Sequence, residues 1–228
     1  LLLLFLAACD SQQTSEEESS LDGLGTAGVE ITTPFSSSST TENGGTVSTK
    51  VRLKSAPLSP VTITLNSSDT QEGTVSPTVL TFNKDNWDSY VSIIVTGVDD
   101  DIADGSQSYE IQIASVVSED SKYSALNGQI NPIKLQNEDD EIKAIVLGSL
   151  SGDTTEAGGN ATFSVKLASK PIEAVSIPII STDTSEGTVS VSSLSFDNSN
   201  YNTVQTVTVN GEDDDERDGN IAYQVKIG

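Results

Sequence analysis

Carboxylates gather in one short stretch of the chain, Asp99-Asp100-Asp101-Ile102-Ala103-Asp104-Gly105, where four acidic residues occur within six positions. Carboxylates this close repel one another unless water or a cation neutralises them. The chain has no His and a single Cys, Cys9, so the nitrogen and sulfur ligands that soft metals favour are scarce. The chemistry open to this stretch is therefore binding of a hard cation through oxygen atoms, and the alternative is a solvated acidic loop.

The acidic stretch belongs to an internal repeat. It returns 114 residues later as Asp213-Asp214-Asp215-Glu216-Arg217-Asp218-Gly219, and an ungapped alignment of 42–113 with 156–227 gives 29 identities in 72 positions. Self-similarity at a fixed offset indicates two copies of one structural unit. We predict one domain over 28–140 and a second over 141–228. The second would lack its last strand, so we expect the parent protein to continue beyond Gly228.

Strand signals fill the repeats, and no helix-period run is visible. Val61, Ile63 and Leu65 alternate with threonines, which predicts a strand with one buried and one solvated face. In the first repeat we expect seven antiparallel strands, at 29–35, 46–54, 60–66, 78–83, 89–96, 108–114 and 130–136. The predicted fold class is all-β, with tandem seven-strand immunoglobulin-like sandwiches and the second one truncated.

Strand direction predicts where the acidic residues meet. If consecutive strands alternate in direction, the connections after the first, third and fifth strands lie at one end, together with the end of the seventh. Those places hold Glu42, Asp69 with Glu72, Asp99 to Asp104, and Glu138-Asp139-Asp140-Glu141. Loops that converge in this way suit calcium, which takes six to eight oxygen ligands in irregular geometry. An EF-hand is excluded, because Ile102 and Ile111 would stand where that loop needs carboxylates.

These residues resemble a known family. Glu42-Asn43-Gly44-Gly45-Thr46-Val47, then Asp69, then Asp99-Asp100-Asp101-Ile102, then the acidic run at 138–140 are similar to Calx-beta domains, the calcium-binding sandwiches of sodium–calcium exchangers and of many extracellular repeat proteins. The resemblance covers both repeats. It implies calcium ligands at Glu42, Asp69, Asp99, Asp100, Asp104, Asp139 and Asp140 in the first repeat, and at Glu156, Asp183, Asp213, Asp214 and Asp218 in the second. Gln107 and Ile221 depart from the pattern, because an acidic ligand is expected at their position.

The N-terminus resembles an export signal. Residues 1–8 are apolar, too few to span a bilayer and suited to the hydrophobic part of a signal peptide. Leu6-Ala7-Ala8-Cys9 resembles the lipobox of bacterial lipoproteins, a family in which the chain is cut before the Cys and the Cys carries lipid; a secretory signal with an incidental Cys is the alternative. Residues 10–27 are rich in Ser, Glu and Gly, and we predict a disordered linker there.

Three hypotheses about function can be weighed from the sequence. With 34 acidic and 11 basic residues, the net charge of −23 excludes nucleic acid as a partner. The first hypothesis is a lipoprotein of the bacterial cell envelope, periplasmic or surface-exposed, whose domains bind calcium weakly and form a stiffened stalk or adhesion module for an unidentified protein or glycan. The alternative is a cation-independent spacer carrying a C-terminal functional domain. We do not expect an enzyme: a glycosidase needs sugar-stacking aromatic side chains, and the only Trp, Trp87, matches Tyr201 as a packing position.

Overall fold

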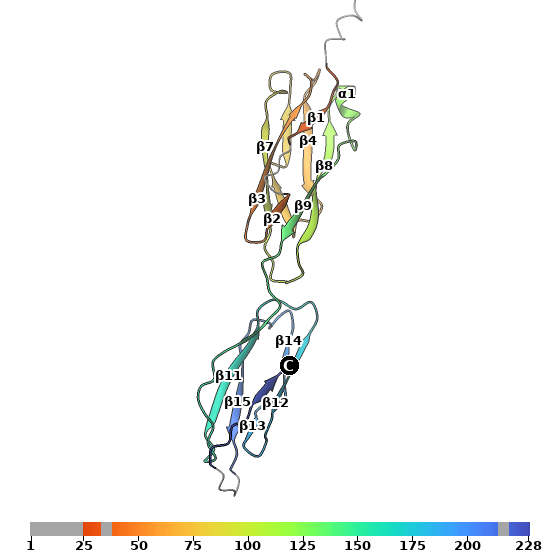
Figure 1. Ribbon diagram of the computed structural model, residues 1–228. Helices are drawn as coiled ribbons and strands as arrows, with labels where there is room; N and C mark the ends of the chain where they lie inside the picture. Colours follow the sequence, from red (N-terminus) through yellow and green to blue (C-terminus); the bar gives the residue numbers. More distant parts are fainter. Residues whose placement is uncertain (1–24, 33–37, 214–218) are drawn as a thin grey trace, which may run out of the picture. The chain divides into compact units, whose positions relative to one another are not determined.

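The computed structural model describes residues 25–32, 38–213 and 219–228 (Figure 1). These residues form β-strands and one short helix, α1 (Ser121–Ser124), which confirms the predicted all-β class. None of the described helical structure is long and apolar enough to cross a membrane. Cys9 and the predicted linker up to residue 24 lie outside the described residues.

The first repeat contains two sheets. The strand order of one sheet is β1-β3-β7-β5, and that of the other is β2-β9-β8-β4-β6. The pairings β1–β3, β3–β7, β4–β8 and β4–β6 are antiparallel. The strands are β1 (Val29–Ile31), β2 (Ser39–Thr41), β3 (Thr46–Leu53), β4 (Val61–Ser67), β5 (Gly73–Ser76), β6 (Val79–Phe82), β7 (Val91–Gly97), β8 (Gln107–Val117) and β9 (Ile133–Glu138).

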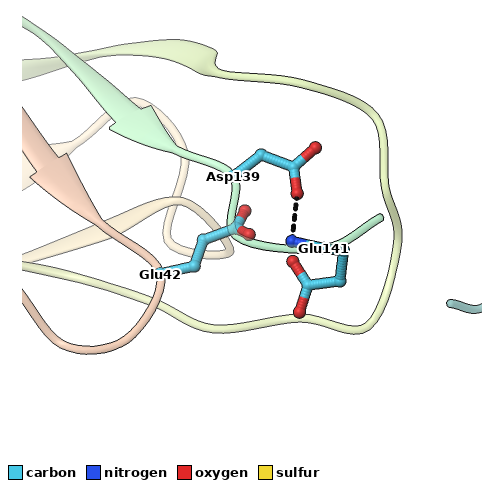
Figure 2. A group of neighbouring side chains, drawn as sticks. All are labelled: Glu42, Asp139 and Glu141. Atoms are coloured by element: carbon cyan, nitrogen blue, oxygen red, sulfur yellow. Dashed lines mark hydrogen bonds between the residues drawn. The ribbon is translucent and has the colours of Figure 1, made fainter. Parts of the chain in front are cut away.

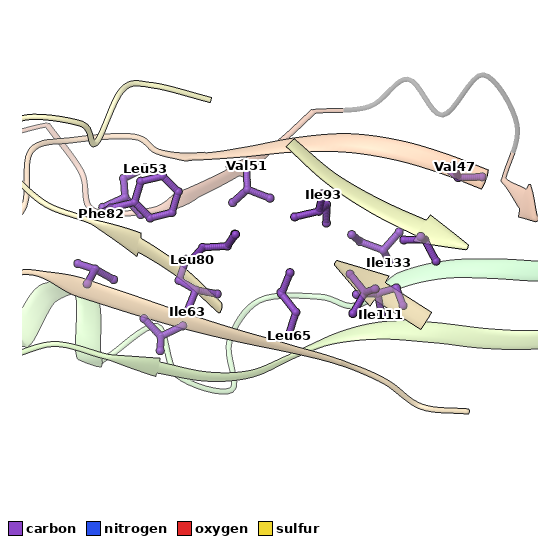
Figure 3. Close-up of a cluster of buried hydrophobic side chains, with 14 of the residues drawn as sticks. Val47, Val51, Leu53, Ile63, Leu65, Leu80, Phe82, Ile93, Ile111 and Ile133 are labelled. Atoms are coloured by element: carbon purple, nitrogen blue, oxygen red, sulfur yellow. The ribbon is translucent and has the colours of Figure 1, made fainter. Parts of the chain in front are cut away.

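Alternation along the strands builds the core of this repeat. In β4 the odd-numbered residues Val61, Ile63 and Leu65 are buried, as their alternation with threonines predicted. They pack with side chains of the other strands, including Phe82 and Ile93, in one apolar cluster (Figure 3). Burying a side chain of this size stabilises the fold by roughly 1.5–3 kcal/mol. The core therefore holds the strand ends, and with them the acidic loops, in fixed register.

The strand count differs from the prediction, because nine strands occur in the described part of this repeat instead of seven. β2 and β5 were not predicted. β5 belongs to the sheet of β7 while β6 pairs with β4, and Pro77 lies between them without the N–H that a continuous ladder would need. Helix α1 was also missed, since a single turn is too short to show a helical period; its Tyr123 is buried and donates its hydroxyl to the Ser55 carbonyl.

The second repeat forms a four-stranded and a three-stranded sheet. Their strand orders are β10-β11-β15-β13 and β14-β12-β16. The strands are β10 (Ile145–Leu147), β11 (Asn160–Leu167), β12 (Val175–Ser181), β13 (Gly187–Val189), β14 (Ser193–Phe196), β15 (Gln205–Gly211) and β16 (Val225–Ile227). A separate apolar cluster, with Ile177, Ile179, Phe196 and Val207 among its members, forms the core. At the 114-residue offset β16 corresponds to β8. Among the described residues, the sheet of β16 has three strands and the sheet of β8 has five.

The chain divides into two compact units, and the division runs through the first repeat. One unit contains the described part of 1–40 together with 45–96 and 108–135; the other contains 41–44, 97–107 and 136–228. This division does not test the predicted domain boundary between residues 140 and 141, which stays a prediction. The three acidic segments of the first repeat, at 41–44, 97–107 and 136–141, share one compact unit, so their mutual geometry lies within that unit.

Candidate metal centre

Glu42 directly follows β2 and is held in place by its backbone. Its N–H donates to the Glu138 carbonyl at 3.0 Å, which joins the segment after β2 to the end of β9. A tight turn follows, in which the N–H of Gly44 donates to the Thr41 carbonyl at 3.1 Å. Gly44 has a φ of +84°, a backbone conformation that favours glycine. The Glu42 residue is only 2% exposed, so its carboxyl group is directed into the protein.

Gly97 and Asn137 bring a third segment to the same place. A Cβ on Gly97 would collide with the Thr41 carbonyl oxygen and with Oδ1 of Asn137, so only glycine allows this approach. Asn137 is fully buried, and its Nδ2 donates to the Val98 carbonyl at 2.8 Å. The acidic loop that begins at Asp99 therefore starts beside the segments that carry Glu42 and the run after β9.

Asp139 ties this acidic loop to the run after β9. Its carboxylate accepts hydrogen bonds from the backbone N–H of Gly105 and, at 2.9 Å, from that of Glu141, drawn as a dashed line in Figure 2. Partial burial opposes ionisation of Asp139, but the two N–H donors hold its pKa below the usual range. Asp139 is therefore an ionised carboxylate at neutral pH.

Two overlapping groups of carboxylates result. Oxygen atoms of Glu42, Asp139 and Glu141 all lie within 4.8 Å of one another (Figure 2), and so do those of Asp99, Asp140 and Glu141. Calcium binds oxygen at about 2.3–2.6 Å, so ligands on opposite sides of one ion are separated by up to about 5 Å. Each group has the spacing to contact one ion with three carboxylates, and Glu141 is common to both groups.

The two glutamates leave polar atoms without partners. Oε2 of Glu42 and Oε2 of Glu141 are buried and accept no hydrogen bond from any described residue. Burial first, and then the neighbouring carboxyl groups of Glu141 and Asp139, raise the pKa of Glu42 to about 8. Burial also raises the pKa of Glu141. At neutral pH Glu42 is therefore mostly protonated, and a cation bound here would take the place of that proton.

The structure brings together four of the seven ligands predicted in the first repeat, namely Glu42, Asp99, Asp139 and Asp140. The other three lie outside both carboxylate groups. The side chain of Asp69 accepts from the N–H of Gln71 at 2.9 Å, and that of Asp100 accepts from the N–H of Ile102 at 2.6 Å. Asp104 is exposed. The role of all seven as ligands stays a prediction.

Glu141 was not among the predicted ligands, although it belongs to the acidic run Glu138–Glu141 that the sequence analysis singled out. The run continues past the end of β9 at Glu138. Beyond a strand the two-residue alternation no longer says which side chains point inward. The sequence indicated the acidic run as a whole. Only the folded structure shows that Glu141 is the residue of this run that belongs to both carboxylate groups.

In the second repeat the predicted ligands do not form such a group among the described residues. Glu156 and Asp213 are exposed. Asp183 accepts hydrogen bonds from the N–H and the hydroxyl of Ser185, which hold its pKa below the usual range. Asp214 and Asp218 lie outside the described residues. No described segment of this repeat occupies the place of β9 and the acidic run after it.

Comparison with known proteins gives distant likenesses only. No family model and no curated protein matches the sequence. Among solved structures, the chain is similar to the calcium binding domain CBD12 of CALX1.1, with 14% identity, a TM-score of 0.38, and 83% of this chain and 76% of that one covered. CBD12 from CALX1.2 gives 13% identity, a TM-score of 0.34 and the same coverage. Domains 5-6 of the S-layer protein SbsC give 15% identity and a TM-score of 0.25 over 89% of this chain and 90% of that one. Likenesses this distant carry no weight for function, and the all-β fold class rests on the sheets described above.

Proposed function

We propose that the cluster of Glu42, Asp139 and Glu141, with Asp99 and Asp140 beside it, binds calcium. The observation that supports this most is Glu42, which is 2% exposed and keeps a buried oxygen without a hydrogen-bond partner among the described residues. Its carboxyl group lies beside those of Asp139 and Glu141 (Figure 2). Burying an uncompensated carboxylate costs several kcal/mol, and a bound cation offsets that cost directly.

The donor set favours calcium over other metals. Every side chain in the two groups is a carboxylate, which suits a hard cation and not a soft one. The carboxylates come from three segments outside the strands, where geometry is irregular. Magnesium demands near-octahedral geometry at about 2.0–2.1 Å, whereas calcium accepts irregular oxygen ligands at longer distances. We expect weak binding, with a Kd on the order of 10⁻⁴ to 10⁻³ M, as in extracellular modules.

The role that we propose for the ion is to stiffen the chain after β9. Asp139, Asp140 and Glu141 follow β9 directly and lead toward β10, so an ion that joins them to Glu42 and Asp99 restrains the link between the repeats. Such a chain would serve as a stalk or adhesion module and not as a catalyst.

The proposed location in the cell envelope, with a lipid on Cys9, rests on the lipobox resemblance. Metabolic labelling with a fatty acid should mark the wild type and not Cys9→Ser.

The test of calcium binding is thermal melting of the whole chain in EDTA, in calcium and in magnesium. A ligand at 100 times its Kd adds about 2.7 kcal/mol to the free energy of unfolding, which raises the Tm by several degrees. We expect this rise in calcium only, and its loss in Glu42→Gln. Glu119→Gln is the matched control, because it removes the same charge from an exposed residue outside the cluster. An equal shift in magnesium, or an unchanged shift in Glu42→Gln, would contradict the proposal.

Stiffening requires its own measurement, since an ion can bind without changing the chain's shape. Small-angle X-ray scattering in EDTA and in calcium should show a narrower distribution of interatomic distances with the ion bound. Identical profiles at calcium concentrations that raise the Tm would leave calcium binding standing and reject the stalk role.

A further inference from the structure

Strand β9 buries an amide at a position where its alternation predicts an apolar side chain. The inward residues of β9 are Ile133, Leu135 and Asn137, and they are 7%, 3% and 0% exposed. Ile133 and Leu135 belong to the apolar core of the first repeat. Asn137 is the most completely buried of the three although it is polar, and burying an amide costs free energy unless it is hydrogen-bonded inside the protein. Core packing alone therefore does not explain an amide at this position.

A hydrogen bond of Asn137 reaches the start of the acidic loop. Its Nδ2 donates to the Val98 carbonyl at 2.8 Å. That carbonyl belongs to the planar peptide group between Val98 and Asp99, so the hydrogen bond fixes the plane from which the Cα of Asp99 extends. Oδ1 of the same amide lies against Gly97, at the place where a Cβ would collide with it. The amide of Asn137 thus sets the direction in which the chain leaves β7.

The other end of the acidic loop is held by the same part of the chain. The N–H of Gly105 donates to the carboxylate of Asp139, which lies two residues after Asn137. The loop 98–105 is therefore fastened at both ends, by a side chain of β9 and by a side chain of the acidic run that follows it. Of the two contacts, the one made by Asn137 is next to Asp99.

The position of Asp99 matters because it is the carboxylate of this loop that belongs to a group with metal-binding spacing. Oxygen atoms of Asp99, Asp140 and Glu141 lie within 4.8 Å of one another. Carboxylates at this spacing repel one another. Because Asp99 is exposed, this repulsion would turn it outward if its backbone were free to move. The hydrogen bond from Asn137 restrains that backbone.

We propose that Asn137 is a positioning residue of the metal centre, which holds the peptide group before Asp99 and so keeps the Asp99 carboxylate beside those of Asp140 and Glu141 when no ion is bound. A site arranged in advance loses less free energy to ordering when its ligand binds. The inference rests on the proposed function for the identity of the ion. The order of the loop does not depend on an ion, so the two can be tested separately.

The test is Asn137→Leu, which removes the amide and continues the apolar pattern of β9 with a side chain of similar size. Calcium is titrated into the whole chain at pH 8, and the amide NMR signals of Asp99 and Glu141 are followed. The Kd should rise at least tenfold, because groups that orient metal ligands typically change affinity by about 10–100-fold. Asn137→Ala removes the same donor without adding bulk and should weaken binding in the same way.

The matched control is Asn86→Ala. The amide of Asn86 also donates to a backbone carbonyl, that of Thr81 at 3.2 Å, and it belongs to neither carboxylate group. Its loss should leave the Kd for calcium within about threefold of the wild-type value. A control that weakens binding as much as Asn137→Leu would show that any lost amide contact has this effect, and would overturn the proposal.

A measurement in EDTA separates positioning from general stability. Nitrogen-15 relaxation should give backbone order parameters of about 0.85 for residues 99–104 in the wild type and in Asn86→Ala, and below about 0.6 in Asn137→Leu. A side chain that only stabilised the fold would leave the loop as ordered as before. Equal order in wild type and Asn137→Leu, whether high or low, would overturn the proposal. A wild type without any calcium response would reject the proposed function, and the order parameters would still decide the role of Asn137.

Discussion

Glu42 and Glu141 hold carboxylate oxygens within 4.8 Å of each other, and each residue keeps a buried Oε2 without a hydrogen-bond partner among the described residues. The two side chains come from the segments that follow β2 and β9, which are neighbours in one sheet. Two carboxyl groups this close share a proton readily, because both cannot ionise without repulsion. The same position can hold a cation instead, so protons and calcium compete for one site.

Stability without calcium should fall as the pH rises. The pKa of Glu42 is raised from 4.5 to about 8 on folding, so the folded state binds more protons than the unfolded state between these values. The free energy of unfolding should therefore decrease across this window, by at most about 1.4 kcal/mol per pH unit. Urea unfolding in EDTA at pH 5, 6, 7 and 8 measures the slope.

Glu42→Gln separates this effect from general charge repulsion, which also grows with pH in a chain of net charge −23. The variant should have a shallower slope than the wild type and should be more stable than it at pH 8. Glu119→Gln should keep the wild-type slope. Parallel slopes for wild type and Glu42→Gln would show that Glu42 ionises normally in the folded protein.

Calcium affinity should increase as the pH rises, whereas the stability without calcium decreases. Below pH 8 calcium must displace the proton on Glu42, so the apparent affinity should increase by up to about tenfold per pH unit and level off above pH 8. Isothermal titration in buffers with different ionisation enthalpies reports both the affinity and the number of protons released. Release of no proton at pH 7 would contradict the assignment of Glu42 as a ligand.

Asp99→Asn should distinguish the two carboxylate groups. Asp99 belongs to the group with Asp140 and Glu141 and not to the group with Glu42 and Asp139. If each group takes an ion, the variant should lose one of two equivalents of calcium and keep the one near Glu42. Equilibrium dialysis measures this stoichiometry. Asp85→Asn is the matched control, since Asp85 is exposed and pairs with its neighbour Lys84; unchanged stoichiometry in Asp99→Asn would exclude a second ion in that group.

Gly97→Ala should damage both fold and site. The added Cβ would meet the Thr41 carbonyl and Asn137, both of which are fixed by neighbouring strands. We expect a loss of more than about 2 kcal/mol in the free energy of unfolding and a weaker calcium response. Gly152→Ala is the control, because a Cβ there meets nothing within 4 Å, and it should change stability by less than about 0.5 kcal/mol. Equal effects of the two substitutions would show that the approach at Gly97 can relax.

Contacts that the structure shows twice follow the 114-residue offset of the repeat. The hydroxyls of Thr40 and Tyr109 lie 2.9 Å apart, and those of Thr154 and Tyr223, at the same offset, lie 2.7 Å apart. Gly97 and Gly211 are likewise both pressed against a backbone carbonyl, that of Thr41 or of Thr155. Alternation in β4 and the convergence of three acidic segments were readable from the sequence, because both follow from strand geometry alone.

What the sequence could not show depends on local competition for hydrogen bonds. Asp69 and Asp100 occupy ligand positions in the motif, but backbone N–H groups two residues ahead engage their side chains. Short Asp side chains often close such turns, and a motif does not reveal when they do so. The burial of Glu42 could not be predicted from the sequence either. It depends on how β2, β7 and β9 pack together, and these strands are far apart along the chain.

The hydrogen bond between the Glu42 N–H and the Glu138 carbonyl has a mechanical consequence. A pulling force that enters the chain beyond Glu141 reaches the sheet at the end of β9, where ladder hydrogen bonds could open one after another. An ion held by Glu42 and Glu141 would fasten that end to the segment after β2. Load would then be shared by two strands at once, and the sheet would resist unzipping only as long as calcium is present.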